Sequence, residues 1–455
     1  MDKTTKTLAE FVYQTDFSKL TEESIHQGKR RLIDSIACAA AAYQEPFCSR
    51  LRSISESYSG VPAARVWGSG KTTSIEMAAF VNGSMIRYLD YSDTFIGKSA
   101  GHPSDMLGAL VALGEGFEAD GKTLITAIVL AYEVYCGLCA SVSLKNNSID
   151  QAVCAAVGTS AGAGKLLRLS RKQIEHAISL ALAPNLHLYN VRCGALSDWK
   201  SCAGPNGARN GVFAALLAQK DITGPSDIID GNGGFFEATT PFEWRKSSIE
   251  TPLILSTHLK YYPVCYHGQT AVDAAVHLHD KVIESSIDEI IVETYEAAYR
   301  AMGSDKERWS PTTRETADHS LPYTISVTLL EGHLTSEHYT EKWLKNERIK
   351  RLIDKVQVKS SQNMTEEYPE RIQTRITINN TDGSSLTYLQ DLPKGHANNP
   401  LSDTEVEEKF MRFFHLFGSK VPAKRAIDLL WKTEGLSNIS EIIDTTCQKP
   451  SHNSG

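Results

Sequence analysis

Residues 155–164 read Ala155-Ala-Val-Gly-Thr-Ser-Ala-Gly-Ala-Gly164, a run in which nearly every side chain is small. Small side chains let two helices approach closely, so the run predicts a helix in the middle of a tightly packed helical domain. Outward from it, apolar residues recur every three or four positions between about residue 7 and residue 260. This spacing predicts helices over 21–42, 76–88, 104–118, 122–143, 150–167, 172–184 and 206–219.

The pattern changes after Pro263. Residues 286–295 are β-branched and partly alternating, which predicts a strand, and residues 371–389 predict a hairpin around Asn380-Thr-Asp-Gly383. Helical spacing over 269–283 and 319–331 makes this part a smaller α+β domain. Amphipathic helices return over 403–416 and 421–434, and they either pack back on the first domain or stand apart from it.

The composition limits the partners of the chain. Its net charge is −7 and its basic residues are scattered, which argues against nucleic acid and acidic membranes. An anionic substrate would therefore need a few local cations. The apolar segment 122–143 carries Glu133 at its centre, so we expect a buried helix rather than a membrane span. Nine cysteines without an even framework, and a start without an apolar signal, predict a cytoplasmic protein with reduced thiols.

The sequence contains short motifs that resemble cofactor sites, but each lacks a feature that such a site needs. Residues 67–74 resemble a phosphate loop, but the position that needs its first glycine holds Arg65. Cys136-Gly-Leu-Cys139 lies inside an apolar helix without a second ligand pair, so we interpret both thiols as buried small side chains. His277 and His279 face different sides of a helix. The sequence therefore predicts neither a metal nor an organic cofactor.

The segments Tyr88-Leu-Asp-Tyr-Ser-Asp-Thr94 and Gly101-His-Pro-Ser-Asp105 place candidate site residues close together. Asp90 and His102 border an apolar core, where a carboxylate and an imidazole must be paired or used. The proline after His102 disfavours α geometry there and would hold the ring at a helix entry. Thr94 lies between them. Ser104 and Asp105 are predicted to be N-caps of the next helix.

Three later loops add candidates. Lys200 lies in a Gly/Pro loop that leads into a helix, whose N-terminus is suited to an anion. The domain switch at 260–267 ends at His267, and residues 314–323 run from Arg314 to Tyr323. Each is either a site residue or an ordinary surface or core residue. Their shared placement at loop edges favours one common pocket.

Taken together, these blocks resemble the MmgE/PrpD family, which includes 2-methylcitrate dehydratase, cis-aconitate decarboxylase and iminodisuccinate epimerase. The resemblance covers nearly the whole chain, with landmarks at Leu89–Thr94, Gly101–Gly108, Lys200–Gly204, Tyr266–Asp273 and Arg314–Tyr323. It implies a large all-α helical domain formed by both ends of the chain (1–262 and 401–455) and an inserted α+β lid domain (263–400). It also implies a homodimer and a cleft without metal or organic cofactor.

Carried over by position, the residues that look like the family's catalytic set are Asp90, His102, Lys200 and Tyr323, with Thr94 beside them. Animal-type cis-aconitate decarboxylases look to have a histidine within the stretch that reads Ile149-Asp-Gln-Ala here, and another in place of Cys265. These departures favour the 2-methylcitrate dehydratase branch. A decarboxylase, a dicarboxylate epimerase and a non-catalytic homologue remain alternatives.

Dehydration of a 2-alkylcitrate removes a proton next to a carboxylate and expels a tertiary hydroxyl group. Lys200 and a protonated His102 could stabilise the carbanion, and His102 or Tyr323 could protonate the leaving group. Asp90 could be the base if burial raised its pKa, or it could orient His102. His267 and Arg314 are candidates for further contacts with a tricarboxylate or dicarboxylate substrate. The sequence leaves these roles open.

Overall fold

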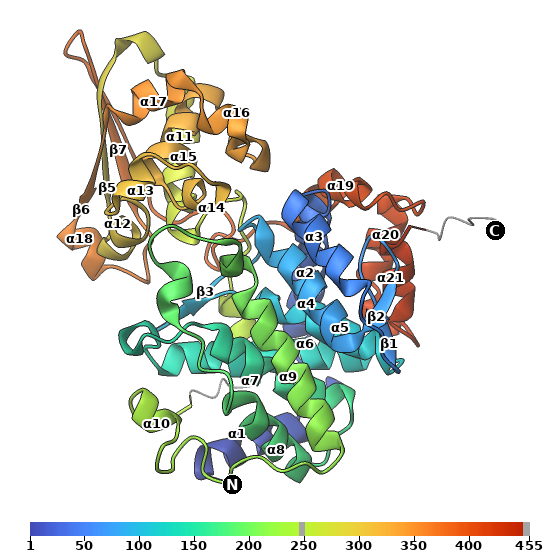
Figure 1. Ribbon diagram of the computed structural model, residues 1–455. Helices are drawn as coiled ribbons and strands as arrows, with labels where there is room; N and C mark the ends of the chain where they lie inside the picture. Colours follow the sequence, from blue (N-terminus) through green and yellow to red (C-terminus); the bar gives the residue numbers. More distant parts are fainter. Residues whose placement is uncertain (245–250, 449–455) are drawn as a thin grey trace.

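The computed structural model describes residues 1–244 and 251–448, which form a large helical lobe and a smaller lobe built around a sheet (Figure 1). The predicted helices of the large lobe are all present. Their bounds are Glu22–Ala42 (α2), Ile75–Tyr88 (α4), Leu107–Gly116 (α5), Gly121–Ser141 (α6), Ala152–Leu166 (α7), Arg171–Leu182 (α8) and Ala203–Gln219 (α9). This lobe also holds α1 (Lys3–Gln14), α3 (Pro46–Ser55) and α10 (Phe235–Ala238).

The small residues of α7 let it pack closely between α6 and α9. A Cβ atom on Gly162 would lie 2.7 Å from the carbonyl oxygen of Ala127 on α6. At the contact between α7 and α9, a Cβ atom on Gly211 of α9 would lie 2.4 Å from the carbonyl oxygen of Ala156 on α7. Neither site has room for a larger residue, so the run 155–164 sets the spacing of these three helices.

Helix α6 belongs to the core. Among the described residues it is the one helix long and apolar enough to cross a membrane, but its most apolar window is 89% buried inside the protein. The carboxylate of Glu133, at its centre, accepts a hydrogen bond of 3.1 Å from the backbone N–H of Ile254. The charge that argued against a membrane span thus anchors the chain near the lobe junction.

The smaller lobe contains a four-stranded sheet in the order β6-β5-β7-β8. The predicted strand is β5 (Ile287–Thr294), and the predicted hairpin is β7 (Thr374–Asn380) with β8 (Ser385–Gln390), paired antiparallel. Strand β6 (Val356–Ser360) runs parallel to β5 at the sheet edge; the sequence analysis missed it because it is short and partly exposed. Helices α11 (Gln269–His279) and α15 (Leu321–Glu331) pack beside the sheet (Figure 1). The remaining helices are α12 (Glu296–Met302), α13 (Lys306–Trp309), α14 (Arg314–Ala317), α16 (Glu341–Leu344), α17 (Glu347–Ile353) and α18 (Gln362–Glu366).

The C-terminal helices α19 (Asp403–Phe413), α20 (Ala423–Leu430) and α21 (Ser440–Thr446) lie against the large lobe, with α19 beside α2 (Figure 1). The ammonium group of Lys409 on α19 is 2.7 Å from a carboxylate oxygen of Asp34 on α2. One hydrophobic core joins residues from 8–259 with residues from 401–447, and a second lies within 262–378. These two cores support the boundaries 1–262, 263–400 and 401–455, which we retain as a proposal.

Candidate active site

Asp90 occupies a strained position at the end of α4. Its φ of +50° is in the left-handed region, which residues other than glycine rarely adopt. Its side chain is 1% exposed, so the strain is maintained by the surrounding contacts rather than by solvent. Strain of this kind concentrates at functional sites, where the fold over-determines an unfavourable backbone.

Three side-chain cations surround the carboxylate of Asp90. The Nζ atom of Lys200 is 3.0 Å from Oδ2, and Nη1 of Arg87 is 3.0 Å from Oδ1. Lys260 donates to the carboxylate and, at 2.9 Å, to the backbone carbonyl of the same residue. All four side chains are at most 2% exposed. A buried carboxylate is stable here because oppositely charged donors replace water.

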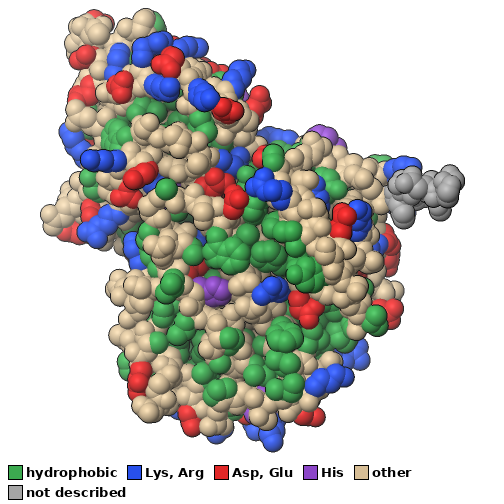
Figure 2. Space-filling view, viewed as in Figure 1, with side chains coloured by type: hydrophobic (Ala, Val, Ile, Leu, Met, Phe, Trp, Pro, Cys, Tyr) green, Lys and Arg blue, Asp and Glu red, His purple; other side chains and the backbone are tan. Residues whose placement is uncertain are grey.

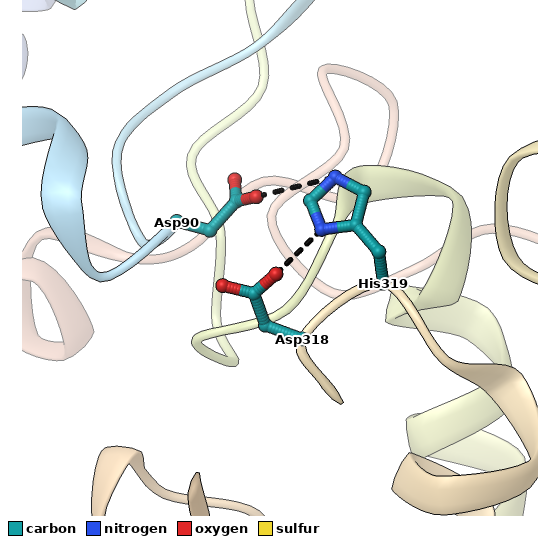
Figure 3. Close-up of side chains that lie close together, drawn as sticks. All are labelled: Asp90, Asp318 and His319. Atoms are coloured by element: carbon teal, nitrogen blue, oxygen red, sulfur yellow. Dashed lines mark hydrogen bonds and ion pairs between the residues drawn. The ribbon is translucent and has the colours of Figure 1, made fainter. Parts of the chain in front are cut away.

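The smaller lobe completes this network with Asp318 and His319, which follow α14 directly. Lys200 Nζ is 3.0 Å from Asp318 Oδ1, so one ammonium group joins carboxylates from both lobes. Figure 3 shows the His319 ring between the two carboxylates, with Nδ1 toward Asp318 and Nε2 3.6 Å from Asp90 Oδ2. The network therefore lies at the lobe junction.

The cations around Asp90 oppose the prediction that burial raises its pKa and makes it the catalytic base. Burial alone would raise the pKa of Asp90, but Arg87, Lys200 and Lys260 outweigh burial and hold it well below its usual value. Burial and Lys200 lower the pKa of His319, yet Cys265 and Asp318 outweigh them and raise it. The arrangement favours ionised Asp90 and protonated His319.

His102 differs from the expectation of a protonated ring. Its Nδ1 is 2.7 Å from the backbone carbonyl oxygen of Asp93, and its Nε2 is 3.0 Å from Nη2 of Arg87. The carbonyl can only accept and the guanidinium can only donate, so the ring carries its proton on Nδ1. Burial, together with Arg87 and Lys260, lowers the pKa of His102 well below its usual value. A neutral His102 follows.

The capping prediction for Ser104 and Asp105 is wrong. A short 3-10 helix, Pro103–Met106, precedes α5, and the N-cap of α5 is Met106 without a side-chain cap. Asp105 is fully buried, and its carboxylate accepts from the side-chain amide of Gln151 at 3.3 Å. Burial raises the pKa of Asp105 to about 7. Tertiary contacts have overridden the local preference for capping.

Thr94 and His267 both lie near this network. Thr94 Oγ1 is 3.3 Å from Nδ1 of His102, and its backbone pairs with that of His258 at the lobe junction. His267 Nδ1 is 2.7 Å from the hydroxyl group of Tyr295. Burial and nearby positive charge, with His319 the largest contributor, lower the pKa of His267 to about 4. Both residues are placed to offer neutral hydrogen-bonding groups.

Tyr323 is not joined to the network. Its hydroxyl group donates to the backbone carbonyl of His338 within the smaller lobe. Among the contacts of the described residues, none links its side chain to Asp90, His102 or Lys200. Arg314 lies at the start of α14, four residues before Asp318, with its guanidinium carbon 5.4 Å from the ring centre of Tyr88.

Asp90, Asp318 and His319 have potential metal-ligating atoms within 4.8 Å of one another (Figure 3). The ammonium group of Lys200 already lies 3.0 Å from each carboxylate, and Arg87 and Lys260 add further positive charge. A divalent cation would face this repulsion at short range. The donor set fits an anion better than a metal ion.

Most of the network is shielded from solvent, and His319 is its partly exposed member. Asp90, Lys200, Lys260 and Asp318 are each at most 1% exposed, whereas the His319 side chain is 16% exposed. Cavities of about 540 and 230 Å³ lie elsewhere, the first beside α17 and the second near Arg30 and His396, and neither is lined by these residues. Solvent therefore reaches the network at His319.

Four residues of the network were not among the predicted site residues: Arg87, Lys260, Asp318 and His319. Arg87 is the one basic residue of α4, and Lys260 begins the domain switch at 260–267, so both carried a signal. Asp318 and His319 lie inside the block 314–323, of which only the two end residues were candidates. Within the stretch 149–152, where the resemblance puts a decarboxylase histidine, Gln151 bonds to Asp105 and Tyr135.

Comparison with known proteins identifies the family of the chain. Residues 6–245 match the MmgE/PrpD N-terminal domain, and residues 262–434 match the MmgE/PrpD C-terminal domain. The chain is 28% identical to 2-methylcitrate dehydratase of Escherichia coli strain K12, covering 80% of each protein. It is 26% identical to the mitochondrial 2-methylcitrate dehydratase of Yarrowia lipolytica, over 92% of this chain and 84% of that one. Human cis-aconitate decarboxylase is 24% identical, over 89% and 86%.

The two matched domains together span most of the chain and include Asp90, His102, Lys200, Asp318 and His319. The family that the sequence blocks predicted is thereby confirmed. This chain belongs to the MmgE/PrpD family of enzymes.

Proposed function

We propose that the chain is a dehydratase that converts 2-methylcitrate, or a related 2-alkylcitrate, to the alkyl-aconitate without a metal ion. The observation that carries this proposal is the buried network at the lobe junction, where three permanent cations meet two carboxylates in a protein of net charge −7. This local excess of positive charge suits a substrate with several carboxylates. The names of the bacterial and yeast relatives support the same reaction class.

In this proposal the neutral His102 takes the carbon-bound proton next to a substrate carboxylate. The protonated His319 gives its proton to the departing hydroxyl group, so the products are an alkene and water. Lys200, Lys260 and Arg87 stabilise the negative charge that develops on the carboxylate. Asp90 holds these cations in place, and Asp318 helps to keep His319 protonated. Solvent then restores the original protonation of both histidines.

Tyr323 has a supporting role in this scheme, because its hydroxyl group is engaged by the backbone of His338. Thr94, His267 and Arg314 contact the substrate. The smaller lobe acts as a lid, since Asp318 and His319 reach the network only when the lobes meet.

The test is to incubate the purified protein with 2-methylcitrate and follow the ultraviolet absorbance of the conjugated alkene. Lys200→Ala should lower turnover by about 100-fold or more, because it removes the cation shared by both carboxylates. Lys172→Ala, at an exposed position on α8, is the matched control and should leave turnover unchanged. Wild-type turnover in Lys200→Ala would contradict the site.

The second candidate is a cis-aconitate decarboxylase, which the similarity to the human enzyme favours. The resemblance puts one histidine within the stretch 149–152 and another at Cys265, and the absence of both from this sequence counts against it. Carbon dioxide release from cis-aconitate without any alkene from 2-methylcitrate would establish it and overturn the dehydratase. An epimerase or a non-catalytic homologue would give neither signal.

We also propose a cytoplasmic homodimer. Figure 2 shows hydrophobic side chains gathered on the face of the large lobe that α9 crosses. Phe213 on α9 and Trp199 just before it are 52% and 45% exposed. Aromatic residues in such a patch are typical of subunit contacts. Light scattering after size-exclusion chromatography should give twice the chain mass for the wild type and one chain mass for Phe213→Glu.

A further inference from the structure

Arg314 is held between aromatic rings of the two lobes. Its guanidinium carbon is 5.4 Å from the ring centre of Tyr88, the last residue of α4 in the large lobe. It is 5.1 Å from the ring centre of Tyr339, which ends a 3-10 helix (Ser336–Tyr339) in the smaller lobe. Cation–π contacts on this scale orient a guanidinium group without using its N–H donors.

Those donors are largely unused. Nη1 lies at the long distance of 3.5 Å from the backbone carbonyl of Ser336, whereas the buried Nε and Nη2 atoms have no hydrogen-bond partner. No carboxylate of the described residues forms an ion pair with this guanidinium, although Glu315 follows it in the chain and contributes to the local field. Buried N–H donors without a partner are unfavourable, so the half-buried Arg314 side chain is suited to an anion that is bound from outside.

Tyr339 presents a second unused donor beside Arg314. Its side chain is 3% exposed, and its buried hydroxyl group has no partner among the described residues. The neighbouring Tyr323 ring, 6.2 Å away between centres, has its own hydroxyl group satisfied by the backbone. A tyrosine chosen only for packing would need no hydroxyl group here, and phenylalanine would avoid the cost.

The free donors have the geometry that a carboxylate needs. Nε–H and the nearer N–H of Nη2 point along one edge of the guanidinium plane, so they bind the two oxygens of one carboxylate in parallel. The ring centre of Tyr339 lies 5.1 Å from the guanidinium carbon, so its unpartnered hydroxyl group is a further donor close to Arg314. These residues are close in sequence to the network, since Tyr88 lies two residues before Asp90 and Arg314 lies four before Asp318.

We propose that Arg314 and Tyr339 form a second carboxylate subsite beside the Lys200–Lys260 network. This inference rests on the proposed function and makes it more specific: the network holds the two carboxylates on the reacting carbons, and the subsite holds the third one. The chain then prefers tricarboxylates to dicarboxylates. Tyr339 is a specificity-determining residue, and it closes the subsite when the lobes meet over Tyr88.

Binding of tricarballylate, a saturated tricarboxylate that cannot be dehydrated, tests the subsite without relying on turnover. Tyr339→Phe keeps the ring and removes only the hydroxyl group, so titration calorimetry should show tricarballylate binding weakened by about tenfold. Arg314→Lys keeps the charge but loses the paired donors, and it should weaken binding by at least about tenfold. Succinate, a dicarboxylate that has the adjacent pair and lacks the third carboxylate, should bind both variants as it binds the wild type.

Tyr262→Phe is the matched control, because it removes a tyrosine hydroxyl group of the same lobe that donates to Asp273 at 2.9 Å. It should leave tricarballylate affinity unchanged. Wild-type affinity of both Tyr339→Phe and Arg314→Lys for tricarballylate would overturn the subsite, as would an equal loss for succinate. Selective loss in the variants without turnover of any alkylcitrate by the wild type would uphold the subsite and overturn only the proposed reaction.

Discussion

Asp90→Asn tests whether the carboxylate of Asp90 is the counter-charge of the network. Asparagine has nearly the same shape and tolerates the left-handed φ of +50°, so the substitution removes charge and leaves the backbone alone. Lys200, Lys260 and Arg87 then lose their shared partner while they stay buried. Breaking a buried ion pair in this way costs about 3–5 kcal/mol. At roughly 2 °C per kcal/mol for a large domain, Tm should fall by about 6–10 °C.

Calorimetry at neutral pH measures this difference, and Asp221→Asn supplies the control. Asp221 is also an aspartate in the left-handed region, with φ of +59°, but it is exposed. Its substitution should change stability by less than about 0.5 kcal/mol. Equal Tm values for Asp90→Asn and Asp221→Asn would refute the idea that Asp90 balances the buried cations.

The difference in Tm between wild type and Asp90→Asn should depend on pH. The folded-state pKa of Asp90 lies well below that of the unfolded chain, so its contribution to stability is fully present above the unfolded value of about 3.9. This contribution is lost as pH falls through the folded pKa. The gap in Tm between wild type and Asp90→Asn should therefore be constant from neutral pH to about pH 5 and shrink below about pH 4. A gap that widened on acidification would contradict this sign.

Three further substitutions test packing, lobe assembly and catalysis. Gly211→Ala puts a methyl group 2.4 Å from the carbonyl oxygen of Ala156, so unfolding measurements should show a loss of about 1–3 kcal/mol, whereas Gly435→Ala, with open space around it, should show none. Lys409→Met leaves the buried carboxylate on α2 unpaired, and limited proteolysis should release the C-terminal helices sooner. His319 has a raised pKa, so kcat/KM should fall as pH rises through it, and His319→Gln should remove this basic limb of the profile.

Most of the helical lobe could be predicted from the sequence, because its signals are local. The spacing of apolar and small residues in 155–164 already requires a buried helix with close neighbours, and the structure places α6 and α9 there. Strand β6 escaped prediction for the opposite reason. Its five residues alternate only weakly, and the parallel partner that makes them a strand lies more than sixty residues earlier in the chain.

The site could be predicted only in part, because local rules and tertiary charges disagree there. Ser104 and Asp105 have the sequence of N-caps, yet Asp105 is used as a buried carboxylate near Arg87 instead. Asp90 stood out as a charge beside apolar sequence, and Lys200 as a lysine in a Gly/Pro loop before a helix. The pKa shift of Asp90 could not be predicted, since its direction depends on how many cations surround the carboxylate rather than on burial.

Charge balance at the lobe junction shows why no single segment reveals the site. Lys200 on its own loop reads as an ordinary surface lysine, yet its ammonium group lies 3.0 Å from carboxylates that come from residues 90 and 318. Each of these charges would be unfavourable if buried alone, and together they stabilise one another. In the proposed reaction, opening of the lobes would separate Lys200 from Asp318 and leave positive charge facing the gap. An incoming carboxylate can then take the place of Asp318 beside Lys200. Substrate binding and movement of the lobes would therefore both depend on the Lys200–Asp318 ion pair.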